Sequence, residues 1–350
     1  MAETNAETMA ERMGSLRIAV TMGDAAGVGP ELCLRLLKEP AALEAAVPLV
    51  FGDAALLKRV ARACGLAEPD RVMAAEEFAR GAEPAGPAVV DFGLLEAEAV
   101  RPGEVQPECG RAAYHYIEAA VRAAQEGRVA AIATAPINKE ALRAAGVPYP
   151  GHTEMLAALT GAGRVCMMLA SKELTVSMVT GHIGLNQVPG ALSVERVREV
   201  IELTAEAMKR LGRKAPRLGV CGLNPHAGER GLFGDKEEER FIEPAIGAAR
   251  QAGIEVEGPV PPDTAFVPER RRRWDAIVCM YHDQGHIPFK MLAFDTGVNI
   301  TLGLPVVRVS VDHGTAFDIA WQGRAGARSM IEAVRWAARL GGARDSERKS

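Results

Sequence analysis

The chain has 350 residues, of which 48% are hydrophobic and 25% are charged, and its formal net charge at pH 7 is −4. This length predicts about two domains, and the composition is that of an ordinary globular protein. The small net charge provides no broad basic surface, so we expect no nucleic-acid partner, and no apolar run reaches the ~20 residues of a membrane-spanning helix.

Both ends of the chain are polar. Residues 1–15 lack the apolar segment of a signal peptide and, like residues 343–350, are expected to form flexible tails. The six cysteines are scattered without a C-x-x-C pair, which is typical of a reduced protein. These features predict a cytoplasmic location.

Short apolar runs alternate with helical patterns along the chain, which predicts an α/β fold with βαβ units and a mostly parallel sheet. Residues 166–182 differ, because two β-rich runs around Ser-Lys-Glu predict an antiparallel hairpin and hence a mixed sheet. The expected strands are 16–23, 47–53, 129–136, 217–224 and 274–283, and the expected helices are 29–40, 54–66, 110–127, 193–212 and 237–253.

Three histidines follow separate predicted strands. Ligands of open α/β sheets gather at the carboxyl ends of the strands, so His182, His226 and His282 can converge on one ion although they are distant in sequence. Imidazole suits Zn²⁺, Co²⁺ or Ni²⁺, and an open fourth position would leave room for a substrate. The alternative is that each is a hydrogen-bonded structural residue.

Arg308 interrupts an apolar run, residues 304–311, where an unpaired charge would be costly to bury. We therefore expect an anionic partner for it, such as a carboxylate or a phosphate. Lys290 and Asn299 precede it, and their alternative is a surface position beside a strand.

Two glycine-containing turns are further candidates. His152 and Thr153 lie at an expected helix start, where they either hold a phosphate or, in the case of Thr153, simply cap the helix. Asp24 lies in the glycine-rich stretch 23–31 after the first strand, which is either a site or a plain strand–helix turn, with Pro30 in the first turn of the helix.

Four segments carry a family resemblance: NPHAGE (224–229), MYHDQG (280–285), VNITLGLP (298–305) and SVDHGTA (310–316). They resemble the 4-hydroxythreonine-4-phosphate dehydrogenase family, including its branch that acts on 4-phospho-D-threonate or 4-phospho-D-erythronate. The resemblance implies a homodimer of two-domain α/β/α sandwiches similar to isocitrate and isopropylmalate dehydrogenases, with the active site between the domains and near the dimer interface. The implied domains are residues 16–135 plus 305–340 on the cofactor side, and residues 136–304 with the metal, the substrate and the interface.

The resemblance also implies the site residues. The implied divalent-metal ligands, one of them from the partner subunit, are His182, His226 and His282. The implied substrate-binding residues are His152, Thr153, Lys290, Asn299 and Arg308. The segment 313–320 resembles a loop that holds the adenosine half of NAD, and its candidate residues are His313, Gly314 and Asp318.

The chain departs from the family pattern at several positions. Ala25 and Gly184 stand where proline is usual, and Trp321 stands where glycine is expected. Neither loss of proline removes a chemical group, whereas Trp321 would reshape the rim of the cofactor pocket. His286 resembles the threonate/erythronate branch, because an apolar residue is usual in the vitamin B6 enzyme.

The implied activity is oxidation with decarboxylation of a 4-phosphorylated 3-hydroxy acid, using NAD or NADP and a divalent metal (Zn, Co, Mg or Mn). The substrate is 4-phosphohydroxy-L-threonine or its analogue 4-phospho-D-threonate or 4-phospho-D-erythronate. Lys290 is the first candidate for proton transfer or carboxylate orientation, and Asp283 the second. The alternatives are a metal-dependent hydrolase and a non-catalytic protein that binds a phosphorylated metabolite.

Overall fold

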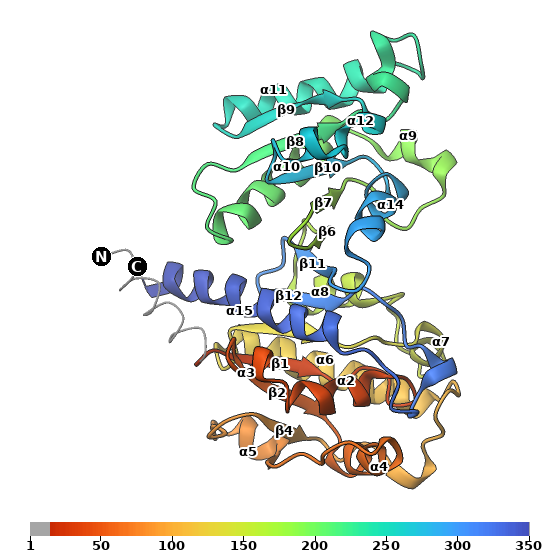
Figure 1. The fold of residues 1–350 in the computed structure, drawn as a ribbon, viewed down its shortest axis with the longest axis vertical. Helices are drawn as coiled ribbons and strands as arrows, with labels where there is room; N and C mark the ends of the chain where they lie inside the picture. The colour runs from red at the N-terminus through yellow and green to blue at the C-terminus, as the bar shows by residue number, and fades with distance from the viewer. Residues whose placement is uncertain (1–14, 350) are drawn as a thin grey trace. The chain divides into compact units, whose positions relative to one another are not determined.

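The computed structural model describes residues 15–349, which fold into two compact units (Figure 1). The first unit runs to Gly163 and resumes at Leu304, and the second unit is Arg164–Gly303. Residues 136–163, which the sequence analysis places in the second domain, therefore belong to the first unit. Nearly all of the predicted N-terminal tail, residues 1–14, lies outside the described residues.

The first unit contains a parallel sheet with the strand order β3-β4-β2-β1-β5-β12. Its strands are β1 (Arg17–Thr21), β2 (Val47–Gly52), β3 (Val72–Ala74), β4 (Ala88–Asp91), β5 (Ala131–Thr134) and β12 (Arg308–Val311). Its helices are α2 (Gly29–Leu36), α3 (Pro40–Leu43), α4 (Ala54–Cys64), α5 (Ala75–Ala79), η1 (Ala97–Ala99), α6 (Pro107–Gln125), α7 (Lys139–Ala144), α8 (His152–Thr160), η5 (Phe317–Ile319) and α15 (Arg328–Lys349).

Helices cover the sheet of the first unit, and the long helix α6 shows how an apolar face packs on it. In α6 the buried residues recur at helical spacing, with Cys109, Ala113, Tyr116 and Ala120 among them. This face packs against β1 and β2, whereas α15 packs against β5 and β12 (Figure 1). Helix α15 continues to Lys349, so most of the segment that the sequence analysis treats as a C-terminal tail is helical.

The second unit contains a mixed sheet with the strand order β11-β6-β7-β10-β8-β9. Its strands are β6 (Cys166–Ala170), β7 (Thr175–Met178), β8 (Arg217–Cys221), β9 (Glu255–Val260), β10 (Ala276–Cys279) and β11 (Val298–Leu302). Its helices are η2 (Leu185–Gln187), α9 (Val188–Ala191), α10 (Val194–Arg210), η3 (Pro225–Glu229), the π-helix η4 (Glu238–Ile242), α11 (Glu243–Gln251), α12 (Pro262–Ala265), α13 (Pro268–Arg271) and α14 (His282–Ala293).

The predicted hairpin is present in this second sheet. Strand β6 pairs antiparallel with β7 and with β11, whereas β7, β10, β8 and β9 are parallel neighbours in that order. The Ser171 hydroxyl shapes the hairpin turn by accepting hydrogen bonds from the backbone N–H groups of Glu173 and Leu174, both at 3.1 Å. The α/β class and the mixed, mostly parallel pairing predicted from the sequence are thus confirmed.

The pairing also places the polar segments. Because β7, β10 and β8 are parallel neighbours, their carboxyl ends lie along one edge of the sheet. The segments that leave these three ends carry His182, His282 and His226, respectively. Within the described residues, no helix is both long and apolar enough to span a bilayer.

Candidate active site

Hydrogen bonds link the three strand ends of the second unit that carry the histidines. After β7, the Thr180 hydroxyl donates to the Met280 carbonyl at 2.8 Å. The Gln284 side chain accepts from the Met280 N–H at 2.6 Å and donates to the Gly222 carbonyl, just past β8, at 2.8 Å. Gln284 is buried, so these bonds are shielded from water. The edge is therefore one connected backbone frame, and the sequence analysis did not single out Gln284.

Two of the three histidines come together on this frame. The ring centroids of His182 and His282 lie 5.2 Å apart. His282 Nδ1 lies 2.7 Å from the Asp283 carboxylate, and His286 stacks on the His282 ring with centroids 3.5 Å apart. A carboxylate on one ring nitrogen orients an imidazole and leaves its other nitrogen available, which is the pattern of a metal-ligating histidine. Asp283 thus orients His282 by direct contact.

The histidine pair fits a shared ion, but the third histidine is not placed with it. Tetrahedral zinc with Zn–N bonds of about 2.0–2.1 Å holds two imidazole centroids about 5 Å apart, close to the observed separation. The His226 ring instead contacts Phe233, with centroids 6.2 Å apart. Among residues 15–349, no three His, Cys, Asp or Glu side chains are grouped so as to hold a metal ion. The joint three-histidine site therefore stays a prediction.

His226 lies in a left-handed turn. Its φ is 53°, and Ala227, Gly228, Glu229 and Arg230 also have positive φ. A left-handed conformation costs about 1–2 kcal/mol for each non-glycine residue, so such a run persists only where its surroundings enforce it. The turn exposes the His226 ring to solvent. Strained backbone of this kind is concentrated at functional sites.

A second polar cluster lies in the first unit, around Arg308. Its side chain is 3% exposed, and its Nε and Nη2 donate to the Thr134 hydroxyl at 3.2 and 2.7 Å. Desolvation lowers the pKa of Arg308 to about 9. The burial expected from the sequence is present, and these two hydrogen bonds go to a neutral hydroxyl rather than to the expected carboxylate or phosphate. A buried guanidinium is also a suitable donor to a carboxylate or phosphate oxygen of a ligand.

His152 belongs to the same cluster. Burial, followed by the positive charges of Arg308 and Lys139, lowers the pKa of His152 well below its ordinary value, so its imidazole is neutral at pH 7. Its Nε2 is buried and has no hydrogen-bond partner among the described residues. His152 is the first residue of α8, where free backbone N–H groups favour an anion. Lys139 was not singled out from the sequence, although it follows the end of β5.

Thr153 does not cap this helix. The N-cap is Gly151, which has no capping side chain, and Thr153 is already inside the first turn. The capping interpretation of Thr153 is therefore wrong. The first N–H groups of α8 gain no acceptor from an N-cap side chain, and a ligand oxygen could serve them.

The glycine-rich stretch after β1 buries a carboxylate. Asp24 is 1% exposed, and its Oδ1 accepts from the Ala26 N–H at 2.9 Å. Its Oδ2 is buried without a hydrogen-bond partner among the described residues. Burial raises the pKa of Asp24 to about 6, although the bond from Ala26 lowers it. Gly23 before it has a φ of +72°, and a Cβ there would lie 2.3 Å from the Pro136 carbonyl, so only glycine fits.

Two departures from the family pattern touch each other. Trp321 is 8% exposed, and its indole N–H donates to the Ala25 carbonyl at 3.1 Å. The guanidinium of Arg59 lies 4.9 Å from the Trp321 ring centroid. Trp321 has a φ of 61°, a conformation for which glycine is the usual residue. The indole thus ties the segment after β12 to the glycine-rich turn after β1.

The other predicted residues lie on surface segments or strand β11. His313, Gly314 and Asp318 are exposed in the loop after β12, and their contact with a cofactor stays a prediction. Lys290 is half-buried on α14, with its ammonium 5.4 Å from the Phe294 ring centroid. Asn299 is half-buried on β11, opposite Leu169 of β6.

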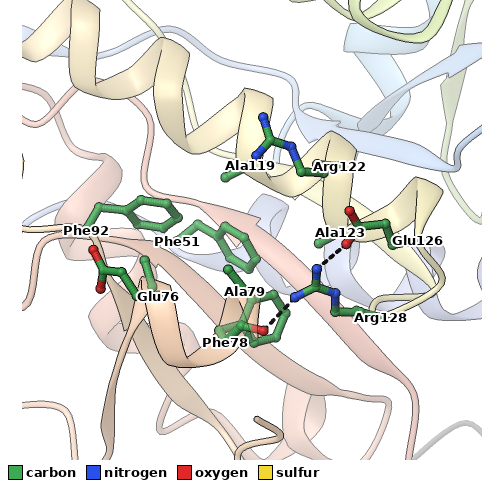
Figure 2. Close-up of a pocket in the computed structure, with 11 residues that line it drawn as sticks. Phe51, Glu76, Phe78, Ala79, Phe92, Ala119, Arg122, Ala123, Glu126 and Arg128 are labelled. Carbon is green, nitrogen blue, oxygen red and sulfur yellow. Dashed lines mark hydrogen bonds and ion pairs between the residues drawn. The ribbon is translucent and has the colours of Figure 1, made fainter. Parts of the chain in front are cut away.

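A separate cavity of about 260 Å³ lies in the first unit, and Figure 2 shows its lining. Phe51, Phe78 and Phe92 form an apolar wall, and Arg128 donates to the Phe78 carbonyl at 2.6 Å. None of the site residues predicted from the sequence lines this cavity. The rest of its lining is alanine and four charged residues, which are Glu76, Arg122, Glu126 and Arg128.

Exposed apolar side chains accompany the histidines. Eight of the twelve large exposed apolar residues in the described part of the chain lie on the three segments that carry His182, His226 and His282. They are Ile183, Leu185, Leu232, Phe233, Ile287, Met291, Leu292 and Phe294, with exposed fractions up to 81% at Met291. Such a concentration of apolar surface is typical of a protein interface.

Known proteins resemble the chain over nearly its whole length. The family model of the pyridoxal phosphate biosynthetic protein PdxA matches residues 44–337. A 4-hydroxythreonine-4-phosphate dehydrogenase from Desulfosudis oleivorans is 49% identical over 91% of this chain and 94% of its own. A D-threonate 4-phosphate dehydrogenase from Cupriavidus necator is 48% identical over 92% of this chain and 96% of its own.

A solved structure agrees with these relatives. The crystal structure of a 4-hydroxythreonine-4-phosphate dehydrogenase from Klebsiella pneumoniae is 46% identical, covers 93% of this chain and 100% of its own, and superposes with a TM-score of 0.83. The fold and these relatives define an α/β oxidoreductase of the dehydrogenase class. Within that class, the chain belongs to the PdxA family of pyridoxal phosphate biosynthetic proteins, which confirms the resemblance carried by the four motifs.

Proposed function

We propose that this chain is a dehydrogenase that oxidises and decarboxylates a 4-phosphorylated 3-hydroxy acid, using NAD and a divalent metal ion. The observation that carries the proposal is the cationic cluster of the first unit. A buried guanidinium at Arg308, a buried unpartnered nitrogen at His152 and the nearby charge of Lys139 suit the oxyanion of a small phosphorylated acid.

The proposed roles of the residues combine their contacts with the family resemblance. Arg308 and the start of α8 bind one anionic group of the substrate, and Lys290 and Asn299 of the second unit orient the other. The three proposed metal ligands are His182 and His282, which lie together, and His226. A bound divalent ion would supply Lewis-acid polarisation of the C3 hydroxyl, and bound NAD would accept the hydride. Lys290 is the proposed proton-transfer group, and His313, Gly314 and Asp318 are the proposed contacts to the cofactor.

We further propose that the chain acts as a homodimer, with the histidine segments near the interface. The support is the exposed apolar set on the same three segments, which a second copy of the chain would cover. An arrangement in which one ligand comes from the partner subunit also agrees with the finding that, of the three proposed ligands, only His182 and His282 come together within the described part of one chain.

Two substrate classes are open to this site. The relatives named above are a D-threonate 4-phosphate dehydrogenase and a 4-hydroxythreonine-4-phosphate dehydrogenase, at nearly equal identity. We favour the threonate class, because His286 stacks directly on His282 and so places a further imidazole beside a proposed metal ligand. That imidazole is the feature that resembles the threonate/erythronate branch.

The test is NADH formation from each candidate acid. The purified chain, loaded with Zn²⁺, Co²⁺, Mn²⁺ or Mg²⁺, is mixed with NAD and with 4-phospho-D-threonate, 4-phospho-D-erythronate or 4-phosphohydroxy-L-threonine, and absorbance at 340 nm is followed. We expect turnover with at least one acid and the highest kcat/KM for 4-phospho-D-threonate. Release of inorganic phosphate without NADH would instead identify a metal-dependent hydrolase, and binding without turnover a non-catalytic protein.

His282→Ala tests the metal role within the same assay. Loss of a ligand that is also oriented by Asp283 should lower turnover by at least about 10³-fold, because both the Lewis acid and the position of the substrate depend on it. His115→Ala is the matched control, because His115 lies on α6 in the first unit. Near-normal turnover of His282→Ala in chelator-treated buffer would contradict the metal role.

A further inference from the structure

The left-handed turn at His226 is built around two buried carboxylates. Glu238, at the start of the π-helix η4, is 1% exposed, and Glu237 before it is 4% exposed. Neither carboxylate has a role in the function proposed above. Burying a carboxylate costs free energy unless several hydrogen bonds satisfy it. The hydrogen bonds of these two carboxylates therefore indicate their role.

Both carboxylates bind the segment that leads into the turn. Glu238 Oε1 accepts from the backbone N–H groups of Leu223 and Asn224, both at 2.8 Å. Glu238 Oε2 accepts from the side-chain amide of Asn224 at 3.0 Å, and Glu237 accepts from the same amide nitrogen at 2.9 Å. The Asn224 carbonyl in turn accepts from the Ala227 N–H at 3.1 Å, which closes the turn on the far side of His226.

The backbone is shaped to fit these groups. A Cβ on Gly228 would lie 2.6 Å from Glu238 Oε2, and a Cβ on Gly222 would lie 2.7 Å from the Ala227 Cα. A Cβ on Gly234 would lie 2.3 Å from the Asn224 amide nitrogen. Three glycines thus let the chain close around the two carboxylates and the Asn224 side chain.

The ionised state of Glu237 agrees with this arrangement. Burial raises its pKa, but hydrogen bonds from Asn224 and from backbone N–H groups outweigh burial, so the pKa lies below its ordinary value. An ionised acceptor forms stronger hydrogen bonds than a neutral one, which is what a strained backbone needs to persist.

We propose that Glu238 is a positioning residue, which, with Glu237 and Asn224, holds the left-handed turn so that the His226 imidazole is presented to a divalent metal ion. The proposal rests on the function proposed above only in that it takes His226 as a ligand. Groups of this kind behind a ligating histidine typically change metal affinity by about 10–100-fold.

Glu238→Gln is the sharpest variant, because it keeps the side-chain shape and removes one acceptor. A Gln nitrogen would face either the Asn224 amide or the two backbone N–H groups, all of which are donors. Glu243→Gln is the matched control, because Glu243 is exposed at the start of α11 in the same segment. The probe is Co²⁺ alone, titrated into the metal-free dimer without NAD or substrate and followed by its visible absorption.

We expect Glu238→Gln to raise the Kd for Co²⁺ by 10–100-fold and to change the Co²⁺ spectrum, while Glu243→Gln binds as the wild type does. Amide hydrogen exchange at Leu223 and Asn224 should speed up in Glu238→Gln alone. A wild-type Kd and spectrum for Glu238→Gln would overturn the proposal, as would Co²⁺ binding unaffected by His226→Ala.

A second variant keeps the test valid if Glu238→Gln does not fold. Gly228→Ala leaves both carboxylates in place, but its Cβ would collide with Glu238 and its φ is +77°. We expect the same loss of Co²⁺ affinity from this displacement, and unchanged binding would contradict the proposal. The NADH assay distinguishes this inference from the proposed function. Co²⁺ binding that depends on His226, without NADH formation, would contradict the proposed function alone. NADH formation by the wild type, together with unchanged Co²⁺ affinity in Glu238→Gln, would contradict this inference alone.

Discussion

The two units handle charge in opposite ways. In the first unit the proposed substrate-binding residue Arg308 is buried, at 3% exposed, and so is the carboxylate of Asp24, at 1% exposed. In the second unit the proposed ligands His182 and His226 are exposed, and the buried charges are Glu237 and Glu238, which hold backbone. If the proposals above hold, burial strengthens a charge for substrate binding in the first unit, whereas in the second unit buried carboxylates fix the backbone that presents solvent-facing imidazoles.

This difference predicts different responses to mutation. Removing a buried binding charge should relieve a desolvation cost, so affinity falls while stability does not. Removing a buried group that holds backbone should leave donors and acceptors unsatisfied, so stability and metal affinity fall together. The following variants test the two cases, beginning with the largest expected effect.

Arg308→Met removes the buried charge of the first unit. We expect kcat/KM for the phosphorylated acid to fall by about 10²–10³-fold, because a desolvated, charge-assisted contact to the substrate is lost. The unfolding free energy should stay unchanged or rise, because desolvation lowers the pKa of Arg308 and an apolar chain of similar size carries no charge into the interior. Urea unfolding and NADH kinetics measure the two quantities.

Arg111→Met is the matched control for this variant, because Arg111 is exposed on α6. A loss of stability in Arg308→Met together with unchanged kcat/KM would show that the guanidinium is structural. The proposed difference between the two units would then be wrong for Arg308.

Gln284→Leu tests the second unit. The substitution removes the bonds to the Met280 N–H and to the Gly222 carbonyl and leaves both backbone groups buried without that partner. We expect a loss of about 2–4 kcal/mol in unfolding free energy. Because this side chain joins the strand ends that carry His226 and His282, the Kd for Co²⁺ should also rise about 10-fold.

Gln251→Leu, an exposed position at the end of α11, controls for the change of residue type. If Gln284→Leu lost stability but kept wild-type Co²⁺ affinity, the frame would serve folding only, and the histidines would be positioned independently of it.

The contrast also explains which features the sequence predicts. Apolar runs predict strands β1, β5, β8 and β10, because buried parallel strands have this pattern. His182 and His282 are predicted together because parallel neighbours end at one edge of the sheet. Arg308 is predicted to be buried because it interrupts an apolar strand.

The supporting groups could not be predicted in the same way. Glu237 and Glu238 lie in a run of charged residues, 235–240, which has the composition of a solvated surface segment. Their burial depends on a π-helix and on a left-handed turn that closes around them, and neither has a periodicity that the sequence displays. Gln284 belongs to no pattern that marks it in the sequence, and it reaches Gly222 only because β10 pairs with β8.

Asp24→Asn gives the smallest expected effect and extends the comparison to an acidic group. Burial raises the pKa of Asp24 from its ordinary value of 3.8 to about 6, so the folded state holds the proton more tightly than the unfolded state does. This contribution to stability is complete below pH 4 and is lost as the pH rises through about 6, which corresponds to about 3 kcal/mol at most. Asparagine lacks this dependence, so Asp24→Asn should match the wild type near pH 4 and exceed its unfolding free energy by up to about 3 kcal/mol above pH 7.

Urea unfolding from about pH 4 to above pH 7, with exposed Asp263→Asn as the control, measures this difference. An equal pH dependence in Asp24→Asn and the wild type would show that Asp24 is ionised without cost in the folded chain. If the variant is more stable at pH 7.5 but forms less NADH, the Asp24 carboxylate lowers the stability of the fold and supports activity, as proposed for Arg308. The first unit would then hold charges of both signs in a state that binding, rather than folding, requires.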